Sequence, residues 1–184
     1  QHYGDWTPHH LDYGETTLLD IYDNNLAVNP GKPATWFFGR SLTVAEIDRQ
    51  VRAAAAGLRA LGVRPGDRVA VALPNCPQHL VIFYAVLKLG ATVVEHNPLY
   101  TTPELRGPFQ DHAARVAVVW DKAAPVFERL RGQSELETIV TVNMIDEMPR
   151  TMQLALKLPL PMLRKKRDQL TAPAPNSLPW AMLL

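Results

Sequence analysis

Segments with the pattern of β-strands and of α-helices alternate from Thr43 to Val142, and this alternation restricts the fold more than any other feature of the sequence. Four apolar runs are predicted strands, the first two of them buried: residues 69–73, 91–96, 115–120 and 137–142. Strands joined through helices form parallel sheets. We therefore expect the α/β class, a layered subdomain in which helices cover a parallel sheet and the carboxyl ends of the strands share one edge.

The clearest helix follows Thr43. Thr43 and Glu46 have capping-box spacing, in which each side chain accepts a hydrogen bond from a free backbone N–H of the other residue. Apolar residues then recur every three or four positions and form one stripe: Ile47, Val51, Ala54, Leu58 and Leu61. Gly62 is the expected end of this amphipathic helix.

Two further helices are predicted on either side of the second strand. The residues after Pro77 are apolar on nearly all sides, which predicts a deeply buried helix. The next helix has a capping pair, Thr101 with Glu104, or begins at Thr102 as the cap. Gly107-Pro108 is expected to interrupt it, because proline lacks the backbone N–H that a helix interior requires.

Three parts are expected along the chain. Residues 1–15 form an N-terminal extension, residues 16–142 an α/β subdomain, and residues 143–184 a basic, Pro-rich segment. The subdomain is predicted to start with a helix over residues 16–27 and a small hairpin near residues 34–41. The last part is expected to be irregular. Residues 171–180 lack a periodic apolar pattern, which indicates a linker that leads to a further region.

Composition excludes several functions. The net charge is +1, which gives no indication of a nucleic-acid partner. The single cysteine, Cys76, cannot form an internal disulfide, as is usual in the cytoplasm. The longest apolar run, Leu80 to Leu87, has eight residues, against about 20 for a membrane span. The six histidines lack the spacing of known metal sites, so we expect no metal.

The sequence also lacks common catalytic motifs. Neither G-x-x-x-x-G-K-[ST] nor G-x-G-x-x-G occurs, so a P-loop or an ordinary dinucleotide site is not supported. Cys76 lies at a predicted helix start, where a thiol pKa can fall. The surrounding "PNCP" is explained more simply as a turn and cap, and we do not assign a nucleophile.

The stretch "VVEHNPLYTTPEL", residues 93–105, joins a strand end, an Asn-Pro turn and a helix start. Catalytic groups of α/β proteins often lie at such turns. The same residues also explain a purely structural corner, because proline ends a strand and threonine caps a helix. We favour the corner and keep three residues as candidates to line a substrate channel: His96, Asn97 and Tyr100.

The segment around residues 154–167 places cations beside leucines. Its basic candidates for contact with an anionic membrane surface are Arg164, Lys165, Lys166 and Arg167. Pro149, Pro159 and Pro161 exclude one long helix. We favour the alternative that this segment extends over the protein surface and is solvated.

Several motifs together resemble the N-terminal part of the adenylate-forming superfamily, and most closely the bacterial long-chain fatty-acid–CoA ligases. They are "SLTVAEI", "GDRVAVALPN", "LKLGATVVEHNPLY" with "NPLYTTPEL", and "LALKLPLPMLRKKRDQLTAPAP", which is similar to an insertion before the family's phosphate loop. The resemblance implies a parent enzyme that uses ATP, Mg²⁺ and CoA to convert a fatty acid into acyl-CoA through an acyl-adenylate. It also implies the remaining domains of that ligase as partners, and a cytoplasmic location with contact to the inner membrane as an option.

The chain departs from the family where the chemistry begins. The phosphate loop ending in Pro-Lys-Gly and the adenylation lysine do not occur, so we carry over no catalytic residue and expect the segment to bind no cofactor by itself. Some relatives have arginine at the position of Leu99, so no CoA role is assigned there. We expect this segment to be inactive alone. The alternative is a non-catalytic lipid- or membrane-surface-binding module.

Overall fold

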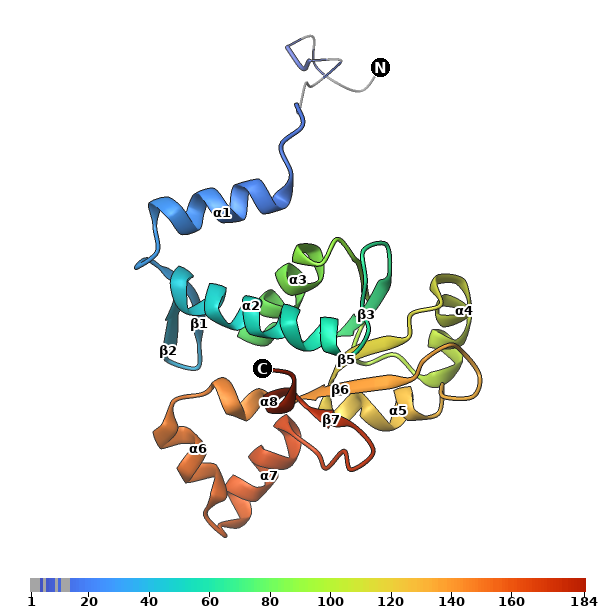
Figure 1. Cartoon of the computed structure of the whole chain (residues 1–184). Coiled ribbons are helices and arrows are strands. Elements are labelled where there is room, and N and C mark those ends of the chain that lie inside the picture. Colours follow the sequence, from blue (N-terminus) through green and yellow to red (C-terminus); the bar gives the residue numbers. More distant parts are fainter. Residues whose placement is uncertain (1–3, 5, 9, 11–13) are drawn as a thin grey trace.

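A parallel five-stranded sheet forms the centre of the computed structural model (Figure 1). The structure describes residues 4, 6–8, 10 and 14–184, so most of the predicted extension 1–15, including His2, His9 and Asp12, lies outside the described residues. The strand order is β4-β3-β5-β6-β7, and each neighbouring pair is parallel. Their bounds are Arg68–Ala72 for β3, Thr92–Glu95 for β4, Val116–Trp120 for β5, Thr138–Val142 for β6 and Leu178–Pro179 for β7. The predicted α/β class with a parallel sheet is confirmed.

Helices cover both faces of this sheet. Val69 and Val71 of β3 belong to a core shared with α2 (Val44–Ala60) and α3 (Pro77–Lys88). Ala70 and Ala72 face the opposite way, into a core with α4 (Thr102–His112) and α5 (Ala124–Glu128), which follows the short 3₁₀ helix η1 (Asp121–Ala123). Successive side chains of a strand point to opposite faces, so burial on both sides requires a continuous apolar run.

The predicted second strand is not buried on both faces. β4 is the edge strand and pairs only with β3, and its residues are exposed or half-buried. An apolar run alone does not separate an edge strand from a central one.

The two helices on the first face differ in how well they were predicted. α2 has the predicted capping box: the Glu46 carboxylate accepts from the Thr43 N–H at 2.8 Å, and Thr43 Oγ1 accepts from the Glu46 N–H at 3.2 Å. α3 is buried on one face only, because Leu80 and Phe83 remain half-buried on its outer side. The expected deep burial of α3 is therefore corrected to burial of one face.

Helix α4 runs without interruption through Pro108, contrary to the prediction. A proline inside a helix costs about 3 kcal/mol. Leu105 and Phe109 are fully buried in the second core, and burial of one such side chain contributes about 1.5–3 kcal/mol. Packing on the sheet thus offsets the cost of Pro108.

The N-terminal elements agree with their predictions. Helix α1 (Leu18–Val28) starts with a capping box between Thr17 and Asp20. Strands β1 (Pro33–Phe37) and β2 (Arg40–Thr43) form an antiparallel hairpin. Phe38 and Gly39, in its two-residue turn, both have positive φ, at 49° and 91°. Turns of this kind match the twist of paired strands.

The last part of the chain is more ordered than the sequence predicts. After η2 (Met144–Glu147) come two helices, α6 (Arg150–Lys157) and α7 (Pro161–Leu170). The expected linker, residues 171–180, ends in strand β7 and leads into the short helix α8 (Trp180–Leu183), with Trp180 and Leu183 in the first core. Two paired residues and one helical turn are too short to produce a periodic pattern. Within the described residues, no helix combines the length and apolar character that a bilayer span requires.

Helix α8 docks on α2 at Gly57, and Gly57→Ala tests this contact. A Cβ on Gly57 would lie 2.0 Å from the carbonyl oxygen of Leu183. Alanine favours a helix interior over glycine by about 1 kcal/mol. Burial of Trp180 and Leu183 is worth more, about 1.5–3 kcal/mol for each large side chain. We expect Gly57→Ala to release α8, shift tryptophan fluorescence to the red and lower the free energy of unfolding. Ala56→Gly, at an exposed α2 position, is the control and should leave the fluorescence unchanged. An unshifted spectrum for Gly57→Ala would contradict this docking.

Candidate functional site

The carboxyl ends of the strands bring several separate segments of the chain to one edge of the sheet. Asn75 and Cys76 follow β3, His96 follows β4, Asp121 follows β5 and Asn143 follows β6. Ligands of open α/β sheets usually bind at this edge. It is therefore the candidate functional site.

The corner after β4 is built around a histidine pair. His96 Nε2 lies 3.1 Å from His112 Nε2, and the His96 ring stacks on Phe109. His112 Nδ1 accepts the Ala114 N–H at 3.0 Å, so a neutral His112 carries its proton on Nε2 and donates to His96. Burial and the neighbouring His112 lower the pKa of His96 to about 4. Both rings are therefore neutral at physiological pH.

The other two candidates of this corner face outward. Asn97 Oδ1 accepts the Leu99 N–H at 2.9 Å, an Asx turn that shapes the backbone. Tyr100 is 40% exposed. The structure thus brings His96 to His112 and does not gather His96, Asn97 and Tyr100 around one cavity. Their role as channel lining stays a prediction.

The start of α4 settles which threonine is the cap. Thr101 is the N-cap, and the Glu104 carboxylate accepts from the Thr101 N–H at 2.7 Å and from its hydroxyl at 2.6 Å. The Thr102 hydroxyl donates to the Val126 carbonyl at 3.4 Å. The hydrogen-bonding capacity of these polar groups is thus used to stabilise the start of the helix.

A surface hollow of about 450 Å³ lies beside the ends of β3 and β4. Leu80 and Phe83 supply apolar walls, and His79 Nε2 lies 2.9 Å from the Glu95 carboxylate at its rim. Cys76 lines the same hollow, and burial raises the pKa of its thiol to about 11. A protonated thiol is a poor nucleophile, which agrees with the sequence interpretation of "PNCP".

A second hollow, of about 580 Å³, lies at the ends of β5, β6 and β7. Its lining includes three acidic residues and one arginine: Asp121, Asp146, Asp168 and Arg167. Asp121 is 5% exposed, burial raises the pKa of its carboxyl to about 6, and the Thr171 hydroxyl donates to it. Sequence reasoning missed Asp121; its place directly after a buried strand was the available signal.

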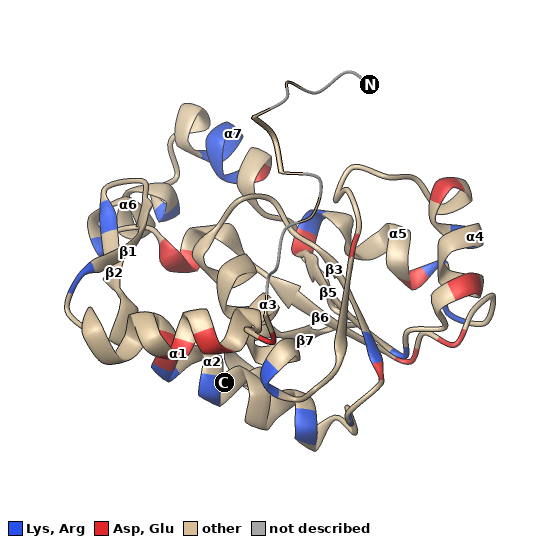
Figure 2. Cartoon of the chain, turned by 90° about the horizontal axis from the view of Figure 1, so that it is seen from above, with Lys and Arg blue, Asp and Glu red and all other residues tan. Residues whose placement is uncertain are grey.

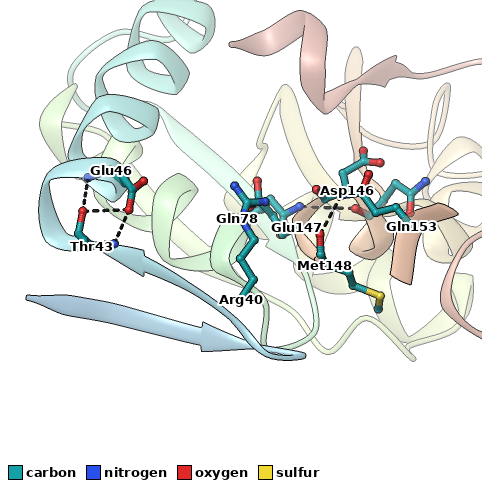
Figure 3. A network of polar contacts seen from close by, with 9 residues as sticks. Arg40, Thr43, Glu46, Gln78, Asp146, Glu147, Met148 and Gln153 are labelled. Carbon is teal, nitrogen blue, oxygen red and sulfur yellow. Dashed lines mark hydrogen bonds and ion pairs between the residues drawn. The ribbon is translucent and has the colours of Figure 1, made fainter. Parts of the chain in front are cut away.

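A network of polar contacts joins the hairpin to this edge (Figure 3). Arg40 of β2 forms an ion pair with Glu147 of η2 at 2.7 Å, although the two residues are 107 positions apart in the sequence. Burial raises the pKa of the Glu147 carboxyl, and the Arg40 guanidinium opposes this shift. Gln153 of α6 donates to the carbonyls of Asp146 and Met148 at 2.9 and 2.8 Å. The network fixes η2 and α6 against the rest of the fold.

The basic candidates lie on α7. Arg164, Lys165 and Lys166 are exposed, whereas Arg167 is partly buried beside the second hollow. Figure 2 shows Lys and Arg on α7, while α2 carries both signs of charge and the charged residues of α1 are acidic only. No single long helix spans this region, as the prolines predicted, but it forms the two helices α6 and α7, where irregular structure was expected.

The described residues do not fit a nucleotide or a metal. Polyphosphates bind at backbone N–H groups of glycine-rich loops and at cations, whereas three of the four charged side chains that line the second hollow are carboxylates. No group of three or more His, Cys, Asp or Glu in the described part of the chain is arranged to hold a metal ion.

The fold is a parallel sheet covered by helices on both faces, and the candidate site lies at the carboxyl edge of its strands. The chain matches the family model described as AMP-binding enzyme over residues 22–178. It belongs to this family of AMP-binding enzymes, and the resemblance drawn from the motifs is confirmed.

Its relatives include CoA ligases named for long-chain fatty acids. The chain is 37% identical to the ligase of Bacillus subtilis over 142 residues, 77% of this chain and 25% of the relative. Identity to the ligase of Escherichia coli is 31% over 133 residues, 72% of this chain and 24% of the relative. A solved long-chain-fatty-acid–CoA ligase from Archaeoglobus fulgidus has a TM-score of 0.64 at 26% identity, covering 72% of this chain and 28% of that one. The chain thus spans about a quarter of the length of the curated relatives it matches.

The pH dependence of the free energy of unfolding tests the burial of Asp121 at this edge. The folded chain holds the Asp121 proton up to about pH 6, whereas an exposed aspartate releases it near 3.8. A pKa raised on folding means that Asp121 destabilises the fold as pH rises through this window. Asp121→Asn should therefore gain stability relative to the wild type between about pH 4 and about pH 7, on the order of 2 kcal/mol.

Urea unfolding at several pH values measures this difference. The lowered pKa values of the histidine pair act in the opposite direction, but they are common to both proteins and cancel in the comparison. Glu135→Gln, at an exposed position, is the control and should show no comparable gain. A difference between Asp121→Asn and wild type that does not vary with pH would rule out this role of Asp121.

Proposed function

We propose that this chain is the N-terminal α/β subdomain of an AMP-forming long-chain fatty-acid–CoA ligase. One observation carries the proposal: several polar groups at the carboxyl edge of the sheet are engaged in internal contacts. His96 pairs with His112, Glu104 accepts hydrogen bonds from the N-cap Thr101, and Glu147 pairs with Arg40. These contacts support a rigid edge against which catalytic groups from elsewhere can be positioned.

The reaction proposed for the parent enzyme converts ATP, a fatty acid and CoA into acyl-CoA, AMP and pyrophosphate. Its first step places negative charge on phosphoryl oxygens, and such steps depend on aligned N–H donors and cations. At the larger of the two hollows on the described carboxyl edge, three of the four charged side chains in the lining are instead carboxylates. ATP, Mg²⁺ and CoA therefore belong, in this proposal, to the remaining domains of the ligase. The subdomain contributes stability and position.

The isolated chain is expected to make no acyl-adenylate. The measurement is pyrophosphate exchange into ATP with a long-chain fatty acid, with a full-length relative such as the Bacillus subtilis ligase as the positive control. We expect exchange at the level of the protein-free blank. Robust exchange by the chain alone would show that it contains a complete active site, and the scaffold proposal would be lost.

A second candidate is a non-catalytic lipid- or membrane-surface-binding module with the same fold. It is favoured by exposed leucines of α6 and of the residues after it, beside the cations of α7. The two candidates differ in whether a protein containing this chain consumes ATP with fatty acid. For both candidates we propose a cytoplasmic location. Vesicle binding tests whether the protein also makes peripheral contact with the inner membrane.

A further inference from the structure

We propose that α6 and α7 form a foot that docks on an anionic bilayer, with the connection between them inserted among the lipid headgroups. The foot comprises residues 150–170. The inference names the element and the lipid class of the membrane contact considered above, and it does not depend on ligase activity. Its tests measure vesicle binding, so their failure is separate from failure of the ligase proposal.

The first observation is a group of exposed apolar side chains at the tip of the foot. Their exposed fractions are 64% for Leu154, 50% for Leu158, 52% for Leu160 and 68% for Met162. Four large apolar side chains within nine residues are left facing water. Exposed apolar patches of this kind mark contact sites for a partner or a membrane.

The second observation is charge. The foot contains six cations, Arg150, Lys157, Arg164, Lys165, Lys166 and Arg167, and one acidic residue, Asp168. Its local charge of +5 exceeds the +1 of the whole chain. Cations beside apolar side chains match the two layers of a membrane surface, anionic headgroups above hydrocarbon.

The third observation is how the foot is held. Gln153 fixes α6 through the carbonyls of Asp146 and Met148. Lys122 donates to the Asp168 carbonyl at 2.7 Å, and Trp120 Nε1 donates to the Leu170 carbonyl at 2.8 Å. Figure 1 shows the connection of α6 and α7 at the end of the foot farthest from the sheet. The tip is therefore presented by a base that is fixed to the sheet.

The composition of the tip suits a headgroup region. Pro159 and Pro161 have no backbone N–H, so fewer donors would be left unsatisfied on leaving water. The two helices have eight and ten residues, far too short to span a bilayer but suited to lie at its surface. An acidic protein would match the cations, but the apolar residues of the tip are exposed and line neither of the hollows described above, so a bilayer matches both features better.

Co-sedimentation of the full chain with vesicles tests the foot. We expect binding to an equal mixture of phosphatidylglycerol and phosphatidylcholine, weakened by salt, and little binding to phosphatidylcholine alone. The variant Arg164→Gln/Lys165→Gln/Lys166→Gln should weaken binding by at least about tenfold, because each cation near an anionic surface contributes separately. Leu158→Ser/Leu160→Ser should weaken it comparably by removing the inserted side chains.

A matched control separates the foot from general charge. Arg49→Gln/Arg106→Gln/Arg129→Gln removes three exposed arginines from other elements and should leave vesicle binding within about twofold. All substituted positions are exposed, and circular dichroism checks that each variant is folded. Equal loss in the control and in the α7 variant, or no binding to the mixed vesicles, would overturn the proposal.

Insertion is tested separately from attraction. An environment-sensitive fluorophore on Leu160→Cys should shift to the blue on mixed vesicles, and the same label on Arg106→Cys should not shift. Cys76 is buried and is changed to alanine in both proteins. Salt-sensitive binding without a shift at position 160 would refute insertion of the tip and would indicate purely electrostatic attraction, as to an acidic protein.

Discussion

The structure depends on the burial of the parallel sheet on both faces. Val69 and Val71 of β3 pack toward α2 and α3, and Ala70 and Ala72 pack toward α4 and α5. The small alanine side chains lie in the core that also holds the rings of Phe109 and Phe127. Small residues on the strand leave volume for large ones on the helices, as close packing requires. Because the sheet is fixed from both sides, the segments that follow its strands are brought to one defined edge.

The polar groups of that edge stabilise the fold in different ways. The capping pair of Thr101 and Glu104 and the ion pair of Arg40 and Glu147 satisfy groups that would otherwise be left without partners. Asp121 acts in the opposite sense, since burial raises its pKa and its ionised form costs stability at neutral pH. A carboxyl held in this way commonly occurs at functional sites, but here it faces other carboxylates rather than a phosphate-binding loop.

The sequence predicted the elements whose signals are local. The capping box of Thr43 with Glu46, the stripe of α2 and the parallel strands were all found from spacing alone. The features that were missed depend on contacts distant in the sequence. The edge position of β4, the unbroken α4 and the docking of α8 are decided by the order of strands and by burial against the sheet. Neither the order of the strands nor the burial against the sheet follows from local residue propensities.

The candidate site shows the same division. The turn after β4 was identified as a corner, and the Asx turn of Asn97 and the cap at Thr101 follow from residue type. The pairing of His96 with His112 joins residues 16 positions apart through the packing of α4, so no motif indicates it. Arg40 and Glu147 are 107 positions apart in the sequence, and only the folded topology brings them together.

The same topology explains why apolar side chains of α6 and α7 face outward. These helices form the crossover between the parallel strands β6 and β7. A crossover helix normally covers a face of its sheet with its apolar side. Here the faces are already covered by α2, α3, α4 and α5, and α6 contributes only Leu156 to the buried core, while α7 contributes no fully buried residue. Helices α6 and α7 therefore lie beyond the carboxyl edge, and the apolar side chains that would otherwise pack on the sheet remain exposed.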